Sequence, residues 1–292
     1  MKILITGNKS YIGSRLIKWL SQWSNKYSVE TLSLRSNEWM KKDFSKYDSI
    51  LHVAAIVHHK EKKGSKEIYF KTNKELAVKI AKKAKMAGVK QFIFMSSMAV
   101  YGLEGEINKD ITITKDTVCR PNTYYGQSKL EAEIELTKIV DDSFNVAIIR
   151  APMIYGPDCP GNYIRLKKII MKIPIFPKVE NKRSMLFVDN LSEFIRLLID
   201  NNDKGLFYPQ NKNYVNTSEL VGLIAKSNNK NIYYSRALAF LVEKLGDHMK
   251  VINKIFGNLT YEKDMSNYRD TEYCVVDTEL SIEICEGLRT GR

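Results

Sequence analysis

The feature that most limits the fold is a regular alternation in the first half of the chain, where short apolar runs are separated by longer amphipathic segments. The runs have the length and β-branched content of buried strands, and they lie at 3–5, 29–34, 49–55, 91–95 and 145–150. The segments at 12–23, 73–87 and 125–140 have helical spacing instead. Strands that alternate with helices in this way predict an α/β fold with a doubly wound parallel sheet.

The charge of the chain suits several kinds of partner. Lys and Arg number 46 against 33 Asp and Glu, which gives a formal charge of +13. Such a field attracts nucleic acid, phosphorylated small molecules or an anionic lipid surface. Because the lysines are spread along the predicted helices and no nucleic-acid motif accompanies them, we expect no nucleic-acid partner. The four cysteines and four histidines lack metal-ligand spacing, so we expect no metal site.

The apolar runs are too short for the chain to cross a membrane, since none approaches the roughly 18 residues of a span. The N-terminal residues enter a strand pattern directly and show no cleavage site. We therefore expect a cytoplasmic protein without an integral membrane segment. The amphipathic stretch 237–255 has two interpretations, because it could lie on a membrane surface or form a helix that covers a ligand.

A glycine-containing turn joins the first predicted strand to the first predicted helix. Such a turn lets backbone N–H groups approach a pyrophosphate at the positive end of the helix. Two glycines of the usual three are present, with Ser10 in the middle position, so the turn alone is equally consistent with an ordinary connection. As a dinucleotide site, it would use Gly7, Lys9, Ser10, Tyr11, Ile12 and Gly13.

The end of the second predicted strand bears on which nicotinamide cofactor is bound. A carboxylate that binds the free ribose hydroxyls is expected about 20 residues after the glycines. No Asp or Glu occurs between Thr31 and Asn37, whereas Arg35 lies there and could hold a 2′-phosphate together with Lys9. The sequence therefore favours NADP(H), and NAD(H) stays possible.

A tyrosine and a lysine four residues apart provide candidate proton chemistry. Tyr125 and Lys129 face the same side of a predicted helix. We expect the Lys129 ammonium to favour the phenolate and so to lower the pKa of Tyr125. A serine-rich strand end precedes this helix, and Ser97 within it is a candidate partner for the Tyr125 hydroxyl.

Together these motifs resemble the extended short-chain dehydrogenase/reductase family, which is the NAD-dependent epimerase/dehydratase family of nucleotide-sugar enzymes. The matching stretches are 6–13, 43–44, 52–55, Asn73, 96–102, 125–129 and 150–157. The resemblance implies a Rossmann sheet in which Tyr125 and Lys129 hold the nicotinamide ribose and Ser97 polarises the sugar oxygen. The further cofactor residues it implies are Asp43, Phe44, Ala54, Ala55, Asn73, Pro152 and Met153.

The resemblance also implies the division of the chain. We expect residues 1–151 to form the dinucleotide-binding Rossmann domain, with a return crossing near 179–206. Residues 152–178 and 207–292 would form a smaller C-terminal lobe that binds a nucleotide sugar. Asn162 in that lobe and Arg183 in the return crossing are candidates for the diphosphate of a UDP-linked sugar, since a guanidinium matches phosphate oxygens.

One departure from the family pattern narrows the reaction. Family members that remove water carry an Asp-Glu pair just after the position of Ser97, where this chain has Met98 and Ala99. Neither side chain can move a proton, so a dehydratase is disfavoured, and Met98 is instead a candidate substrate contact.

Three functions remain open. The first is NADPH-dependent reduction of the C4 ketone of a UDP-4-keto-6-deoxy-N-acetylhexosamine in polysaccharide biosynthesis, with hydride from the nicotinamide and a proton from Tyr125. The second is a UDP-sugar 4-epimerase that retains NAD, and the third is a non-catalytic sensor of NADP. The helices at 73–87 and 125–140 resemble the pair that forms a dimer contact in the family, so a homodimer is expected.

Overall fold

The structure is a computed structural model that describes residues 1–57, 64–246 and 249–289. It divides into two compact units. The first comprises Met1–Gly102, Val118–Ala151 and Ser192–Pro209, and the second comprises Leu103–Thr117, Pro152–Leu191 and Gln210–Arg292.

A six-stranded sheet forms the centre of the first unit. Its strands are β1 (Lys2–Thr6), β2 (Ser28–Leu32), β3 (Ser49–His52), β4 (Gln91–Ser97), β6 (Asn145–Ala151) and β10 (Gly205–Phe207). Their order is β10-β6-β4-β3-β1-β2, and every neighbouring pair is parallel. This confirms the predicted doubly wound sheet. Because the chain leaves β1 in one direction to β2 and in the other to β3, the order reverses between β1 and β3, where α/β folds place their ligands.

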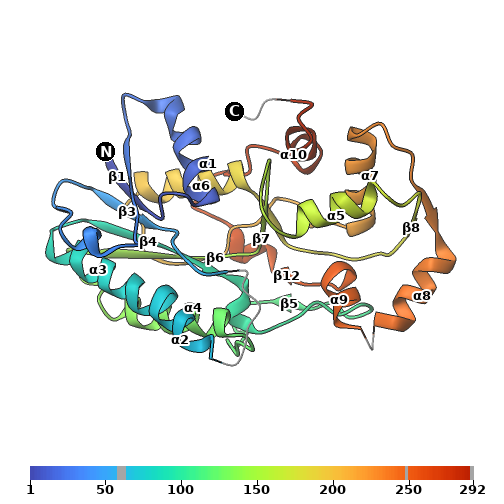
Figure 1. Cartoon of the computed structure of the whole chain (residues 1–292), viewed down its shortest axis with the longest axis horizontal. Helices are drawn as coiled ribbons and strands as arrows, with labels where there is room; N and C mark the ends of the chain where they lie inside the picture. The colour runs from blue at the N-terminus through green and yellow to red at the C-terminus, as the bar shows by residue number, and fades with distance from the viewer. Residues whose placement is uncertain (58–63, 247–248, 290–292) are drawn as a thin grey trace. The chain divides into compact units, whose positions relative to one another are not determined.

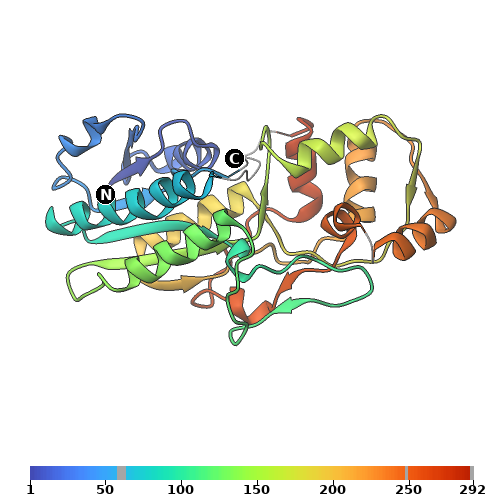
Figure 2. The same cartoon turned by 60° about the horizontal axis from the view of Figure 1, so that its bottom comes forward.

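Helices cover both faces of this sheet. They are α1 (Tyr11–Leu20), α2 (Lys66–Tyr69), α3 (Leu76–Met86), α4 (Tyr124–Thr137) and α6 (Val188–Asp200). In Figures 1 and 2, α3 and α4 lie side by side on one face. On the other face, Trp19 of α1 donates to Glu193 of α6 at 2.9 Å. Small residues on α3 and α4, such as Ala81 and Ala132, pack against the buried phenylalanines of β4.

The second unit consists of short strand pairs and helices. The pairs are β5 (Thr112–Ile113) with β12 (Thr260–Tyr261), β7 (Met153–Tyr155) with β9 (Met185–Phe187), and β8 (Ile175–Pro177) with β11 (Tyr233–Ser235). The helices are α5 (Asn162–Ile170), α7 (Thr217–Ser227), α8 (Arg236–Gly246), α9 (Lys250–Phe256) and α10 (Thr278–Cys285). The amphipathic stretch 237–255 thus falls on α8 and α9. Within the described ranges, no helix combines the length and the apolar character that crossing a bilayer requires.

The division into units differs from the expected one by more than three residues in two places. Residues 103–117, which we expected in the first domain, belong to the second unit, since β5 pairs with β12 there. The return crossing enters the first unit at Ser192 and not near 179, because β9 pairs with β7 inside the second unit. Both differences arise from strand pairings that are remote in sequence and leave no local signal.

Candidate active site

The turn after β1 lies at the reversal of strand order. Gly7 has a φ of +107°, and a Cβ atom there would lie 3.2 Å from the Ala54 nitrogen. The Gly7 N–H also donates to the Leu32 carbonyl at the end of β2, at 2.8 Å. Only a glycine combines this backbone conformation with so close an approach. The turn therefore brings together the carboxyl ends of β1, β2 and β3, with Ala54 and Ala55 half-buried beside it.

The first helix begins directly after this turn. The Ser10 Oγ accepts a hydrogen bond from the Gly13 N–H at 3.0 Å, so the residue in the middle glycine position is the helix N-cap. A Cβ atom on Gly13 would lie 2.5 Å from that same Oγ. Tyr11 and Ile12 are half-buried in the first turn, and Lys9 is exposed. The cap shapes a tight helix start that fits a bound pyrophosphate.

The end of β2 presents a cation and no carboxylate. Arg35 is exposed three residues after the strand. The one acid within β2, Glu30, accepts hydrogen bonds from Lys42 at 2.7 Å and from the Tyr47 hydroxyl at 2.6 Å. Because Glu30 is engaged with these side chains, it does not replace the missing ribose carboxylate.

Three of the expected cofactor residues make contacts within the protein. Asp43 is exposed, and its carboxylate accepts from the Ser45 N–H and Oγ at 2.9 and 2.8 Å, while Phe44 is buried in the core. Asn73 is also fully buried. Its amide accepts from the Ile56 N–H at 2.8 Å and donates to the Ser128 Oγ at 3.2 Å. Asn73 therefore fastens the loop after β3 to α4.

The π-helical segment at Phe70–Glu75 contains Asn73. The sequence pattern shows only a helix beginning at Asn73, whereas α2, the π-helical segment and α3 continue one another from Lys66. Wide turns of this kind re-aim single side chains and are frequent at functional sites. Here the wide turn carries the side chain that joins two segments of the candidate site.

Tyr125 and Ser97 meet at the carboxyl end of β4. The Tyr125 hydroxyl hydrogen-bonds with Ser97, whose Oγ also accepts from the Ala99 N–H at 3.1 Å. A Cβ atom on Gly126 would lie 2.5 Å from the Ala99 carbonyl oxygen. The start of α4 can therefore approach the turn after β4 only with glycine at position 126. Met98, in that same turn, is half-buried.

The electrostatics of the pair differ from the sequence expectation. We expected Lys129 to lower the pKa of Tyr125, but burial raises that pKa to about 12, against the opposing hydrogen bond from Ser97. Lys129 is itself 1% exposed, its Nζ donates to the Met95 carbonyl at 2.7 Å, and burial lowers its pKa to about 7. The expectation was wrong because a buried lysine, only partly charged at neutral pH, stabilises a phenolate weakly.

A buried ionic cluster lies one helical turn beyond Lys129. Arg150 donates from Nη2 to the Glu133 carboxylate at 2.6 Å and from Nη1 to the Tyr101 hydroxyl at 2.9 Å. Glu133 also accepts from Ser96 on β4, and its charge raises the pKa of Lys129 against the effect of burial. Nothing in the local sequence pattern singled out Glu133, which only the tertiary structure brings to Arg150.

In the second unit, Asn162 and Arg183 line one pocket of about 280 Å³. Asn162 is the first residue of α5, and the Arg183 guanidinium donates to the Gly257 carbonyl at 2.8 Å. Burial lowers the pKa of Arg183, and among the described residues no carboxylate lies within ion-pairing distance of it. The pocket also contains two cations that the sequence analysis missed, Arg165 and Lys254.

The remaining walls of this pocket are mainly apolar. The apolar lining residues are Met153, Leu166, Ile169, Met185, Leu220 and Ile255, and Tyr163 and Thr217 complete the walls. Met153 was expected at the cofactor together with Pro152, and the structure places both in the second unit, with Met153 in this pocket. A pocket with an apolar floor and several cations is complementary to a base or ring that carries phosphates.

The sequence of the chain matches a known family over most of its length. A sequence model of the NAD dependent epimerase/dehydratase family matches residues 3–210. The chain belongs to this family. The chain is 31% identical over 219 residues to a UDP-glucose 4-epimerase of Vibrio cholerae. The matched region covers 68% of the chain and 66% of that relative.

The name of a second relative describes a sugar that is linked to a lipid diphosphate and not to a nucleotide. The N-acetyl-alpha-D-glucosaminyl-diphospho-ditrans,octacis-undecaprenol 4-epimerase of Escherichia coli O157:H7 is 27% identical over 216 residues, 68% of this family member and 63% of that protein. The matched region thus spans less than two thirds of the length of either relative. A UDP-glucuronic acid 4-epimerase from Bacillus cereus, solved with NAD, has a TM-score of 0.71 over 98% of both chains, at 18% identity. That structure confirms the fold.

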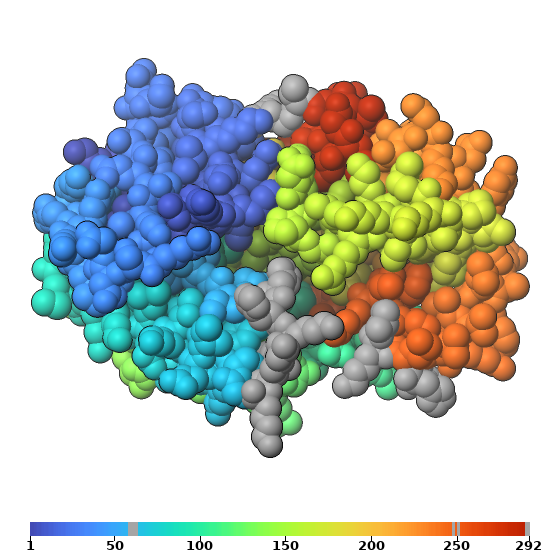
Figure 3. All heavy atoms as spheres, viewed as in Figure 1, coloured from blue at the N-terminus to red at the C-terminus, as the bar shows by residue number. Residues whose placement is uncertain are grey.

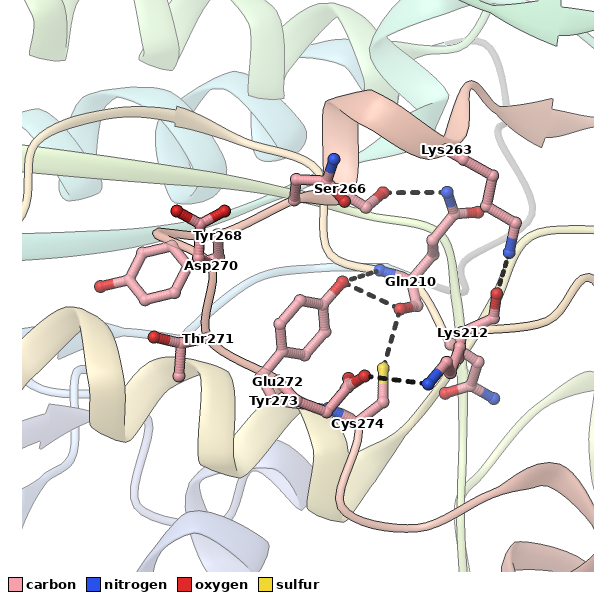
Figure 4. A pocket seen from close by; sticks show the side chains of 12 residues that line it. Gln210, Lys212, Lys263, Ser266, Tyr268, Asp270, Thr271, Glu272, Tyr273 and Cys274 are labelled. Carbon is pink, nitrogen blue, oxygen red and sulfur yellow. Dashed lines mark hydrogen bonds and ion pairs between the residues drawn. The ribbon is translucent and has the colours of Figure 1, made fainter.

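Another pocket of the second unit, with a volume of about 420 Å³, is larger than the pocket that contains Arg183 (Figure 4). The Gln210 side chain donates to the Ser266 hydroxyl at 2.9 Å, and the Gln210 main-chain carbonyl accepts from the Tyr273 hydroxyl at 2.9 Å. Figure 4 also shows Lys263 directed at Lys212. These polar side chains bond to one another or to main-chain carbonyls, and none of the predicted site residues lies among them.

Proposed function

We propose that the protein uses a nicotinamide cofactor to change the oxidation state of a ring carbon in a nucleotide-linked sugar, and that it acts as a C4 reductase. The observation that carries this proposal is the hydrogen bond between Tyr125 and Ser97, with Lys129 one helical turn away, at the carboxyl edge of the sheet. A phenol and a hydroxyl that meet at this edge can bind one substrate oxygen together and transfer a proton to it.

The residues present fit the cofactor. The close approach of Gly7 to Ala54 and the capped start of α1 would hold the pyrophosphate, and Lys129 would hold the nicotinamide ribose. When bound, the cofactor supplies the hydride chemistry at the sugar carbon. The phenol of Tyr125, whose pKa is raised to about 12, is protonated at neutral pH and is ready to donate to a developing alkoxide.

The residues after β2 favour reduction over epimerisation, because they suit NADPH better than NADH. A reductase consumes one reduced cofactor in each turnover, so an exchangeable NADPH suits it. The exposed Arg35, with no carboxylate between residues 31 and 37, supports binding of a 2′-phosphate. We propose a UDP-4-keto-6-deoxy-N-acetylhexosamine as substrate, with Asn162, Arg165 and Arg183 on its diphosphate.

A second candidate is a 4-epimerase that retains its cofactor. The names of the Vibrio and E. coli relatives favour it, and the Bacillus cereus structure carries NAD. The name of the E. coli relative describes a sugar linked to a lipid diphosphate. An epimerase could therefore act on a sugar carried by a nucleotide or by a lipid, and both carriers need to be tested. A homodimer through α3 and α4 also stays a prediction, which light scattering tests.

The deciding experiment offers the purified protein a UDP-4-keto-6-deoxy-N-acetylhexosamine with NADPH or NADH. We expect oxidation of the reduced nicotinamide, and a Tyr125→Phe variant should lose turnover by about 10²- to 10⁴-fold while it keeps its affinity for the cofactor. Without such oxidation, interconversion of UDP-glucose and UDP-galactose would establish the epimerase, as would interconversion of UDP-linked or undecaprenyl-diphosphate-linked N-acetylglucosamine and N-acetylgalactosamine. If neither reaction occurs, and the protein binds NADPH with an affinity that Tyr125→Phe leaves unchanged, the result favours the sensor over both enzymes.

A further inference from the structure

Helix α8 turns apolar side chains outward. Phe240 is 59% exposed and Leu241 is 51% exposed, and Leu238 and Leu245, which share the side of Leu241, are exposed as well. The buried positions of the helix are the small residues Ala239 and Gly246. A surface helix of a globular protein normally directs its apolar stripe to the core, so this arrangement is reversed.

The apolar surface continues onto the neighbouring strands. Tyr233 of β11 is 67% exposed and is the register partner of Ile175 on β8, which is exposed as well. Helix α8 packs next to β8, as Figure 1 shows, and Figure 3 displays α8 in orange on the visible surface. We name the side chains of Ile175, Tyr233, Leu238, Phe240, Leu241 and Leu245 the α8 patch.

The charges around the α8 patch are positive. Arg236 and Lys244 are exposed on the same side of α8, and Lys178, which follows β8, is exposed too. The Lys244 Nζ lies 4.7 Å from the centre of the Phe240 ring. The acid of this helix, Glu243, is half-buried, so the fully exposed charges of α8 are the two cations. Exposed aromatic and leucine side chains with flanking cations are typical of a helix in the interface of an anionic membrane.

We propose that the α8 patch docks on the surface of a bilayer that contains anionic phospholipid. Charge favours a lipid surface over a second copy of the chain as the partner of the α8 patch. A second copy would bring its own Arg236 and Lys244 close to the same cations, and the formal charge of each chain is +13. An anionic lipid surface is complementary to these cations, and its interface accepts Phe240 and Tyr233. This proposal does not depend on the reaction that the protein catalyses.

The test is sedimentation with vesicles of phosphatidylcholine alone or mixed with phosphatidylglycerol. We expect the protein to sediment with the mixed vesicles, to bind at least about 10-fold more weakly to the neutral ones, and to be released by salt. The variant Phe240→Ser/Leu241→Ser should reduce binding to the mixed vesicles by about 10-fold or more. The matched control, Ile68→Ser/Met86→Ser, removes exposed apolar side chains of the first unit and should bind normally.

Thermal unfolding of each variant will check that the fold is kept. The affinity for the cofactor is a second check, and it does not depend on lipid. Equal sedimentation of the two variants would overturn the proposal, as would the absence of binding to both kinds of vesicle. So would a dimer, seen by light scattering, that Phe240→Ser/Leu241→Ser converts to a monomer, because a second copy would then occupy the patch.

Discussion

Gly126 and Ala99 are so close that a Cβ atom on Gly126 would lie 2.5 Å from the Ala99 carbonyl oxygen. Within a helix, alanine is ordinarily better than glycine by about 1 kcal/mol. Here we expect Gly126→Ala to lower the free energy of unfolding by about 1–3 kcal/mol, since the start of α4 must move away. Turnover should fall at least about 10-fold because Tyr125 moves from Ser97.

Urea unfolding and steady-state kinetics check this prediction. Glu135→Ala, at an exposed position of the same helix, is the control and should change both quantities little. A Gly126→Ala protein with full stability and full turnover would contradict the close approach.

The buried Lys129 should make stability depend on pH. Burial lowers its pKa from 10.5 to about 7, so between these values the unfolded chain binds this proton and the folded protein does not. Stability therefore rises with pH in this window. Of the charged neighbours, Glu133 opposes the shift, while His52 stays neutral because burial lowers its pKa to about 3.

The measurement compares the wild-type protein with Lys129→Met by urea unfolding near pH 7 and near pH 9.5. The stability of the wild type relative to the variant should increase by about 1–3 kcal/mol between the two conditions. Parallel curves for the two proteins would show that Lys129 titrates normally.

The buried pair of Glu133 and Arg150 should be strongly coupled. Removing one partner leaves the other charge buried without compensation, which typically costs about 3–5 kcal/mol. We expect a double-mutant cycle with Glu133→Gln and Arg150→Met to give a coupling of about 2 kcal/mol or more. The exposed pair of Glu135 and Lys138, 2.7 Å apart, is the control and should couple by less than about 0.5 kcal/mol.

Arg35 should set the preference between cofactors. If it holds a 2′-phosphate, Arg35→Ala should weaken binding of NADPH by about 10-fold and leave binding of NADH nearly unchanged. Fluorescence titration of both nucleotides gives the two dissociation constants, with the exposed Lys41→Ala as the control. Equal effects of Arg35→Ala on the two nucleotides would remove the argument for NADPH.

Several local signals in the sequence were sufficient to predict structure. The apolar runs identified the strands from β1 to β6, except for the two-residue β5, and the spacing of Tyr125 and Lys129 was correctly assigned to one helix. Other features have no such signal. The cap by Ser10, the clamp by Asn73 and the pairing of β5 with β12 depend on which distant backbone groups lie nearby.

By itself, the sequence determined the parallel sheet, the family and the residue types of the candidate site, because periodicity and short motifs act over neighbouring residues. Tertiary structure alone decided that Tyr125 has a raised pKa, that Glu133 lies against Arg150, and that Asn162 and Arg183 share a pocket. The physical reason is that burial and the field of distant charges depend on the packing of segments far apart in the chain.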